Sequence, residues 1–147
     1  HFTHYMYRRG NHARHISCGW LGYAGHEAID ITTGSPNVIE GYPIYAQGIG
    51  SVTGRSGAAQ HPTMGFWIQI TYTINGTAHR TRYLHMENTP PSWLTDNPST
   101  QVSASTQLGT TGDTGSPGAF HLHLDVTLPN GNRTNPRNMF PDETFTH

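Results

Sequence analysis

Residues 65–86, "GFWIQITYTINGTAHRTRYLHM", constrain the fold more than any other stretch of the chain. Apolar residues at every second position, from Phe66 to Tyr72, alternate with more polar ones, as in a strand with one buried face. Asn75-Gly76 follows, and this pair is typical of a two-residue hairpin turn that demands positive φ. A second alternating run then continues to His85. The pattern predicts an antiparallel hairpin and, with it, a sheet that buries one face.

The rest of the chain has the same character. No window of useful length shows helical periodicity. The sole helix candidate is a turn or two at 91–96, inside a polar, proline-rich stretch at about 87–104 that is too long for an ordinary connection and suggests a functional loop. Further strands are predicted at 27–33, at 42–54 (two short strands around a glycine-containing turn), at 105–113 and at 120–128, with a tight turn at Asn130-Gly131. We therefore expect an all-β fold, in which twisted antiparallel sheets form a groove with long loops and little helix.

Length and composition bound the classes of protein that remain. With 147 residues the chain suits a single domain, 1–147, that can bury a core without disulfides. The single cysteine, Cys18, excludes an internal disulfide and a multi-cysteine zinc site, and we expect it to be a small buried hydrophobe. With a net charge of -1, the chain lacks the excess of basic residues that is typical of nucleic-acid-binding domains. No apolar run approaches the ~18 residues of a membrane span. Since the chain begins without methionine, we expect a domain excised from a larger protein, without its targeting signal.

Histidine is the unusual component, with eleven copies, and two of them lie in "AFHLHLDV" at 119–126. On a strand, residues two apart share a face. His121 and His123 therefore lie together, while Phe120, Leu122 and Leu124 point to the other face and pack. Two neutral imidazoles suit a divalent metal. By itself the motif is also compatible with two polar residues on a half-exposed strand.

Two further motifs carry ligand-type residues. "GHEAIDI" (25–31) places His26 four residues before Asp30. It is not the H-E-x-x-H helix of zincins, because no second histidine follows at the required position and the next residues are β-branched. "RYLHM" (82–86) places His85 at the end of the predicted hairpin, where a sheet rim displays functional groups. Taken singly, His26 and His85 could each be exposed residues without a function.

Together the motifs resemble those of the M23 peptidases, the LytM and lysostaphin-type zinc endopeptidases that cut peptide bonds in bacterial cell-wall peptidoglycan. "GHEAIDI" is similar to the family's H-x-G-x-D-I segment, "RYLHM" to its Y-x-H-L, and "QLGTTGDTGSPGAFHLHLDV" to its glycine-rich turn and H-L-H-F-E-V strand. "YPIYAQGIGSVT" and "NGNRTNPRNMF" also resemble family segments. The similarity extends over about residues 20–140 and leaves 1–19 as an N-terminal extension.

The resemblance implies a site and an activity. His26, Asp30 and His123 would bind one Zn²⁺, and His121 and His85 would form a catalytic pair. The implied reaction is attack by a zinc-bound water on a peptide bond in the cross-bridges or stem peptides of peptidoglycan. One histidine would accept the water's proton and the other would stabilise the oxyanion, with the assignment left open. It also implies a monomer that acts outside the cell or in the cell wall, as a secreted bacterial protein or a phage-borne lysin.

The chain departs from the family pattern at several places. Phe120 stands where proline or a small residue is common before H-x-H, and Asp125 replaces the usual glutamate. The segment 32–41 is longer than usual, and 87–104 lacks the common pattern. Trp93 and Phe120 are candidate walls of a substrate groove, although Trp93 could equally be an anchor packed onto the sheet.

Two other functions compete with peptide hydrolysis. One is an inactive LytM-like domain that binds the cell wall or a partner protein without cutting; such domains usually lose ligands, and this chain keeps all five residues. The other is a carbonic anhydrase-like site, which would need a third zinc histidine more than twenty residues on; His147 is the terminal residue, so we discount this reading. The remaining histidines are not expected to belong to the site: His4, His12, His15, His61 and His79.

Overall fold

The computed structural model describes residues 15–18, 20–32, 41–118 and 120–139. Within these residues it confirms the all-β prediction, because the strands pair antiparallel throughout and the helical content is one 3₁₀ turn, Pro136–Met139. The strands are β1 (His15–Cys18), β2 (Ile29–Thr32), β3 (Pro43–Tyr45), β4 (Gly50–Arg55), β5 (Phe66–Ile74), β6 (Thr77–Met86), β7 (Gln101–Val102), β8 (Gln107–Thr110), β9 (Leu122–Thr127) and β10 (Arg133–Thr134).

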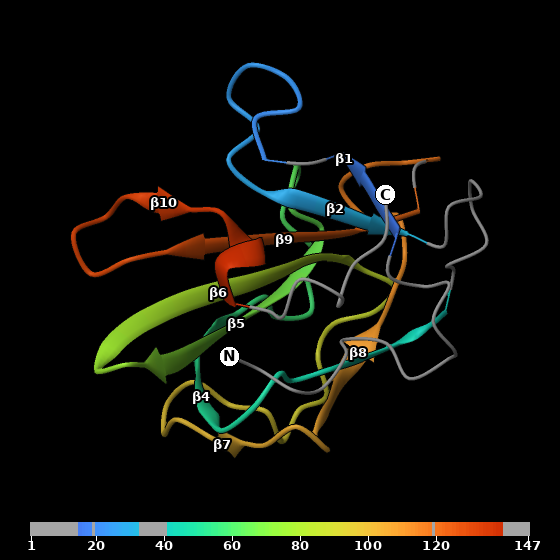
Figure 1. Cartoon of the computed structure of the whole chain (residues 1–147). Coiled ribbons are helices and arrows are strands. Elements are labelled where there is room, and N and C mark those ends of the chain that lie inside the picture. Colours follow the sequence, from blue (N-terminus) through green and yellow to red (C-terminus); the bar gives the residue numbers. More distant parts are fainter. Residues whose placement is uncertain (1–14, 19, 33–40, 119, 140–147) are drawn as a thin grey trace.

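Two sheets make up the fold (Figure 1). The larger has eight strands in the order β1-β2-β9-β6-β5-β4-β7, with β10 added to β9. The smaller pairs β3 with β8. Strands far apart in the sequence are therefore neighbours: β9 lies between β2 and β6 (Figure 1). This arrangement brings the three predicted motifs into contact through β9.

The expected hairpin is β5–β6. Ile74 pairs with Thr77 across the turn, and Asn75 and Gly76 have φ values of 50° and 78°, as this type of turn requires. The other predicted strands are also present, as β2, β3, β4, β8 and β9. The helix candidate at 91–96 is wrong: there the Leu94 N–H donates to the Pro91 carbonyl (3.0 Å) in a simple turn. The short strands β1, β7 and β10 were not predicted, although β10 follows the predicted turn at Asn130-Gly131.

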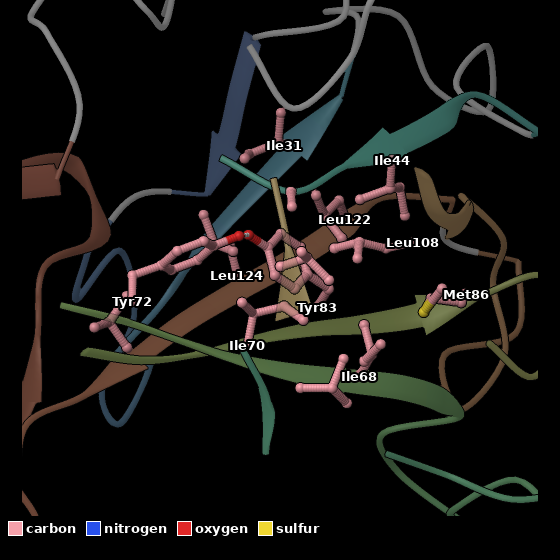
Figure 2. Close-up of a cluster of buried hydrophobic side chains, with 14 of the residues drawn as sticks. Ile31, Ile44, Ile68, Ile70, Tyr72, Tyr83, Met86, Leu108, Leu122 and Leu124 are labelled. Carbon is pink, nitrogen blue, oxygen red and sulfur yellow. Dashed lines mark hydrogen bonds between the residues drawn. The ribbon is translucent and has the colours of Figure 1, made fainter. Parts of the chain in front are cut away.

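The core lies on one face of the large sheet and against the small one (Figure 2). Leu122 and Leu124 of β9 are fully buried in it. The core also contains a pair of buried tyrosines, Tyr72 and Tyr83, whose hydroxyls share a 2.7 Å hydrogen bond (Figure 2). The Gln47 N–H donates to the Tyr72 hydroxyl at 2.9 Å, so the pair is satisfied within the core. Burial raises the pKa of both phenols.

The long loop at 87–104 is held by Arg55 at the end of β4. Its guanidinium donates to the carbonyls of Pro90 (2.7 Å), Pro91 (2.7 Å) and Leu94 (2.9 Å). Leu94 itself is fully buried in the core. Leu94 and Arg55 thus hold the loop in place. Trp93, directly before Leu94 in the sequence, is 58% exposed.

Among the described residues, no helix has the length and apolar character to cross a membrane. The segment 33–40, most of the predicted longer connection, lies outside the described residues, as do His4, His12 and the side chains of His15 and Cys18.

Candidate functional site

The two faces of β9 differ as the sequence predicts. Leu122, Leu124 and Val126 are fully buried in the core, whereas His121 and His123 are half-buried on the opposite face. Phe120 packs against the core. The division of this strand into a packing face and a histidine face is confirmed.

The pairing of β2 with β9 brings the first two motifs together. Asp30 lies directly opposite His123 in the register, and its Oδ1 is 3.2 Å from His123 Nδ1. His26 lies on the loop before β2, which is closed by hydrogen bonds between the His26 N–H and the Tyr23 carbonyl (3.1 Å) and between the Leu21 N–H and the His26 carbonyl (2.7 Å). His26 Nε2 is 3.3 Å from Asp30 Oδ2.

This arrangement fits a metal ion. The ligand-type atoms of His26, Asp30 and His123 all lie within 4.8 Å of one another. The separations are 3.2 Å from His123 Nδ1 to Asp30 Oδ1 and 3.3 Å from His26 Nε2 to Asp30 Oδ2, so one carboxylate oxygen faces each imidazole. Each is close to the distance of about 3.3 Å between neighbouring ligands of tetrahedral zinc with bonds of about 2.0–2.1 Å. Two imidazoles and one carboxylate are also the donor set of a catalytic zinc site that keeps one position for water or substrate. These three residues therefore suit zinc in number, chemistry and spacing.

His85 reaches the same site through a β-bulge. In β6, Leu84 lies opposite His123 in the register, and strict alternation would turn His85 to the core face with Tyr83. The β5–β6 register shifts between Phe66 and Ile68, so that an extra residue of β6 is accommodated there. His85 has φ 63°, a left-handed conformation that costs of order 1–3 kcal/mol in a residue other than glycine. Bulges of this kind re-aim a side chain.

The glycine-rich link before β9 fixes the His85 ring. His85 Nδ1 donates to the Thr114 carbonyl at 2.8 Å, while the Thr114 hydroxyl donates to the Met86 carbonyl and accepts from the Phe66 N–H (3.0 Å). The His85 ring lies 4.7 Å from that of His121 and 5.8 Å from that of His123. The structure therefore brings together all five residues that the sequence singled out.

Burial and hydrogen bonding shift the pKa values of His85 and His123 in opposite directions. Burial lowers the pKa of His85 to about 4 despite the hydrogen bond to Thr114, so its ring is neutral near pH 7. Burial also opposes the charged form of His123, but the hydrogen bonds to Asp125 and Asp30 outweigh it and raise its pKa. For Asp30, burial would raise the pKa, yet the hydrogen bond from His123 and the nearby histidines lower it. An ionised Asp30 is the form that binds a cation.

The sequence did not reveal the surroundings of Asp125. This fully buried carboxylate lies 3.2 Å from His123 Nε2 and is bound by Arg82 and Arg133. Arg82 is opposite Asp125 in the β6–β9 register, and Arg133 enters from β10. The arrangement depends on the register of β9 with β6 and β10, which the motifs did not indicate, even though Arg82 is the first residue of "RYLHM".

A second group of ligand-type residues overlaps the first. His85, His121 and His123 also have ring nitrogens within 4.8 Å of one another. This group shares His123 with the first and lacks a carboxylate. His121 Nε2 is 3.6 Å from Asp30 Oδ1, so the two groups form one continuous cluster.

The two predicted groove residues differ in their surroundings. Trp93 is exposed rather than packed as an anchor, and it lines a hollow of about 560 Å³ with Pro91, Thr106, Gln107 and Gly109. Phe120 contacts the core, and its role as a groove wall stays a prediction. Of the remaining histidines that the structure describes with their side chains, His61 accepts from the Thr63 and Met64 N–H groups, and His79 bonds to the Thr77 carbonyl.

The fold is that of the M23 peptidases. Solved structures similar to this chain include a zinc-containing peptidase from Vibrio cholerae (22% identity, TM-score 0.65, 96% of this chain and 40% of that one). The catalytic domain of the antimicrobial peptidase lysostaphin from Staphylococcus simulans matches at 23% identity and TM-score 0.57, over 90% of this chain and 91% of that domain. The catalytic domain of the prophage-encoded M23 protein EnpA from Enterococcus faecalis matches at 23% identity and TM-score 0.56, over 91% and 85% of the two chains.

The likeness to these proteins is one of structure. The sequence matches no protein-family model and none of the curated proteins. The chain spans less than half of the length of the Vibrio cholerae peptidase, but nearly all of the lysostaphin catalytic domain. The resemblance drawn from the sequence is thus confirmed at the level of the fold.

Proposed function

We propose that this chain is a zinc-dependent endopeptidase that hydrolyses peptide bonds in the cross-bridges or stem peptides of bacterial peptidoglycan. One observation carries the proposal. On a fold shared with peptidases, the ligand-type atoms of His26, Asp30 and His123 lie within 4.8 Å of one another, close enough to bind one metal ion, and His85 and His121 lie beside them. A single zinc ion is the cofactor we propose, and peptidoglycan peptides are the partners.

The side chains would divide the chemistry between them. Bound zinc would lower the pKa of a water to about 7 and polarise the scissile carbonyl. His85 suits the role of base: its Nδ1 donates to Thr114, and a neutral ring then carries its lone pair on Nε2. It would accept a proton from the attacking water and pass it to the leaving amine. His121, adjacent to His85, would donate a hydrogen bond to the carbonyl oxygen as negative charge develops.

The place of action follows from the substrate. Because peptidoglycan lies outside the cytoplasmic membrane, we propose that the protein acts in the cell wall or outside the cell, as a secreted bacterial protein or a phage-borne lysin. We also propose that it acts as a monomer. The exposed Trp93 and the loop that Arg55 holds would form one wall of the groove for the peptide.

Digestion of peptidoglycans with defined cross-bridges tests the proposal. The purified chain, loaded with one equivalent of zinc, is expected to release peptides with new amino termini, identified by mass spectrometry. A chelator should abolish the release and added zinc should restore it. A chain that binds zinc but releases nothing from any type of peptidoglycan would instead be a binding module of the LytM-like kind. His79→Ala, a histidine outside the site, is the matched control and should digest normally.

A further inference from the structure

Asp125 is the most enclosed charged group near the site. Its side chain is fully buried, and four donor groups surround its two oxygens. Arg82 binds it with two parallel hydrogen bonds, from Nε to Oδ1 (2.9 Å) and from Nη2 to Oδ2 (2.8 Å). Arg133 Nη1 and His123 Nε2 also approach Oδ2, at 2.8 and 3.2 Å. A buried carboxylate is costly unless it is paired in this way.

Three strands build this arrangement. Asp125 follows His123 by two residues on β9, so both side chains project from the same face. The register places Arg82 of β6 opposite Asp125. Arg133 comes from β10, which pairs with the far end of β9. The carboxylate is therefore held from both sides by rigid, hydrogen-bonded strands.

His123 is the point at which this group meets the candidate metal site. Its ring has one nitrogen on each side: Nδ1 faces Asp30, and Nε2 faces Asp125. A metal shared with Asp30 must take the lone pair of Nδ1, which leaves the ring proton on Nε2. That proton then has one evident acceptor, the Oδ2 of Asp125. The neighbouring carboxylate thus favours the tautomer that a metal at Nδ1 needs.

We propose that Asp125, clamped by Arg82 and Arg133, is a positioning residue for the metal. By accepting from Nε2–H it selects the tautomer of His123 and fixes the orientation of its ring. The two arginines hold the carboxylate itself in place. This inference rests on the proposed function, because it assigns zinc to His26, Asp30 and His123. In proteins generally, loss of such an outer partner of a metal-binding histidine costs about 10- to 100-fold in metal affinity or activity.

Asp125→Asn is the direct test, with zinc affinity measured by competition against a chromogenic chelator. The variant removes the charge and keeps the shape of the side chain. Its affinity is expected to fall about 10- to 100-fold. Asp96→Asn, which changes an exposed aspartate of the long loop, is the control and should bind zinc as the unchanged chain does. A folded Asp125→Asn protein with unaltered zinc affinity overturns the proposal, even if its stability is reduced, because Asp125 would then serve folding alone.

Spectroscopy of the unchanged chain gives a second readout that does not depend on the variant's folding. In the zinc-loaded protein, ¹H–¹⁵N NMR of the His123 ring should show metal at Nδ1 and a slowly exchanging proton on Nε2. A proton on Nδ1, with Nε2 bound to zinc, overturns the proposal. These outcomes are separate from failure of the proposed function itself, in which the unchanged chain would take up no zinc.

Discussion

The two halves of the site are built in different ways. The half proposed to bind the metal follows regular pairing: Asp30 lies opposite His123 because β2 and β9 are in register, and both point to the same face. The half proposed to transfer protons depends on an irregularity, since His85 reaches the site through a bulge and a left-handed backbone, with its ring held by the Thr114 carbonyl. The geometry of regular strand pairing should change little when single residues are replaced, whereas the position of His85 depends on a few close contacts. Changes to each half should therefore have separable effects.

The largest effect is expected from the metal-binding half. His26→Ala removes one of three ligand side chains, so zinc affinity should fall by more than the roughly 100-fold seen when only an outer partner of a ligand is lost. Peptide release should fall to background, because both the attacking water and the carbonyl lose their activation. Zinc content after dialysis and peptide release measure the two effects. His79→Ala serves as the control.

His85→Ala should separate the two halves. The variant is expected to keep its zinc, since the ligand set of His26, Asp30 and His123 is intact. Activity should fall about 10²- to 10⁴-fold, the usual contribution of a general base. Zinc content and kcat/KM are measured on the same preparation. If zinc is lost together with activity, the metal lies instead among His85, His121 and His123, and the site does not have two separate halves.

Gly65→Ala tests the contacts that hold His85 without touching a histidine. Gly65 has φ 67°, and a Cβ there would overlap the carbonyl and hydroxyl oxygens of Thr114. The free energy of unfolding should fall by about 1–3 kcal/mol. Activity should fall by up to about 100-fold as the His85 ring shifts, and zinc affinity should stay unchanged.

A second glycine in the same conformation provides the control for Gly65→Ala. Gly76→Ala carries the same backbone penalty, with φ 78°, but its Cβ would meet open space. Equal losses of activity in the two variants would show that backbone strain, and not the contact with Thr114, is responsible.

The smallest effect is expected from pH, in the metal-free protein. The pKa of His85, lowered to about 4 by burial, lies below its ordinary value near 6.5, so its contribution to stability is lost as the pH falls from about 6.5 toward 4. The pKa of His123 is raised by Asp125 and Asp30, so its contribution is lost as the pH rises above about 6.5. NMR titration of the two rings measures this difference. Two midpoints on the same side of 6.5 would contradict it.

Much of the fold could be predicted because its signals are local. The alternation in 65–86 and the Asn75-Gly76 turn depend on residues close in sequence, and the structure forms the hairpin they predict. The helix candidate at 91–96 failed for the converse reason. The backbone there is set by Arg55, more than thirty residues earlier in the chain, which binds two of its carbonyls, those of Pro91 and Leu94, and the carbonyl of Pro90 just before it. Helix propensity depends only on residues close in sequence, so it does not reflect this long-range contact.

The same distinction between local signals and long-range contacts applies to the candidate site. By itself the sequence determined the residue types, and it placed His121 and His123 on one face of a strand, because alternation is a property of the extended backbone. Only the tertiary structure decided that Asp30 lies opposite His123, that a bulge turns His85 into the site, and that two arginines enclose Asp125. These are consequences of strand register between distant segments. Register depends on the packing of the whole sheet, which no single motif contains.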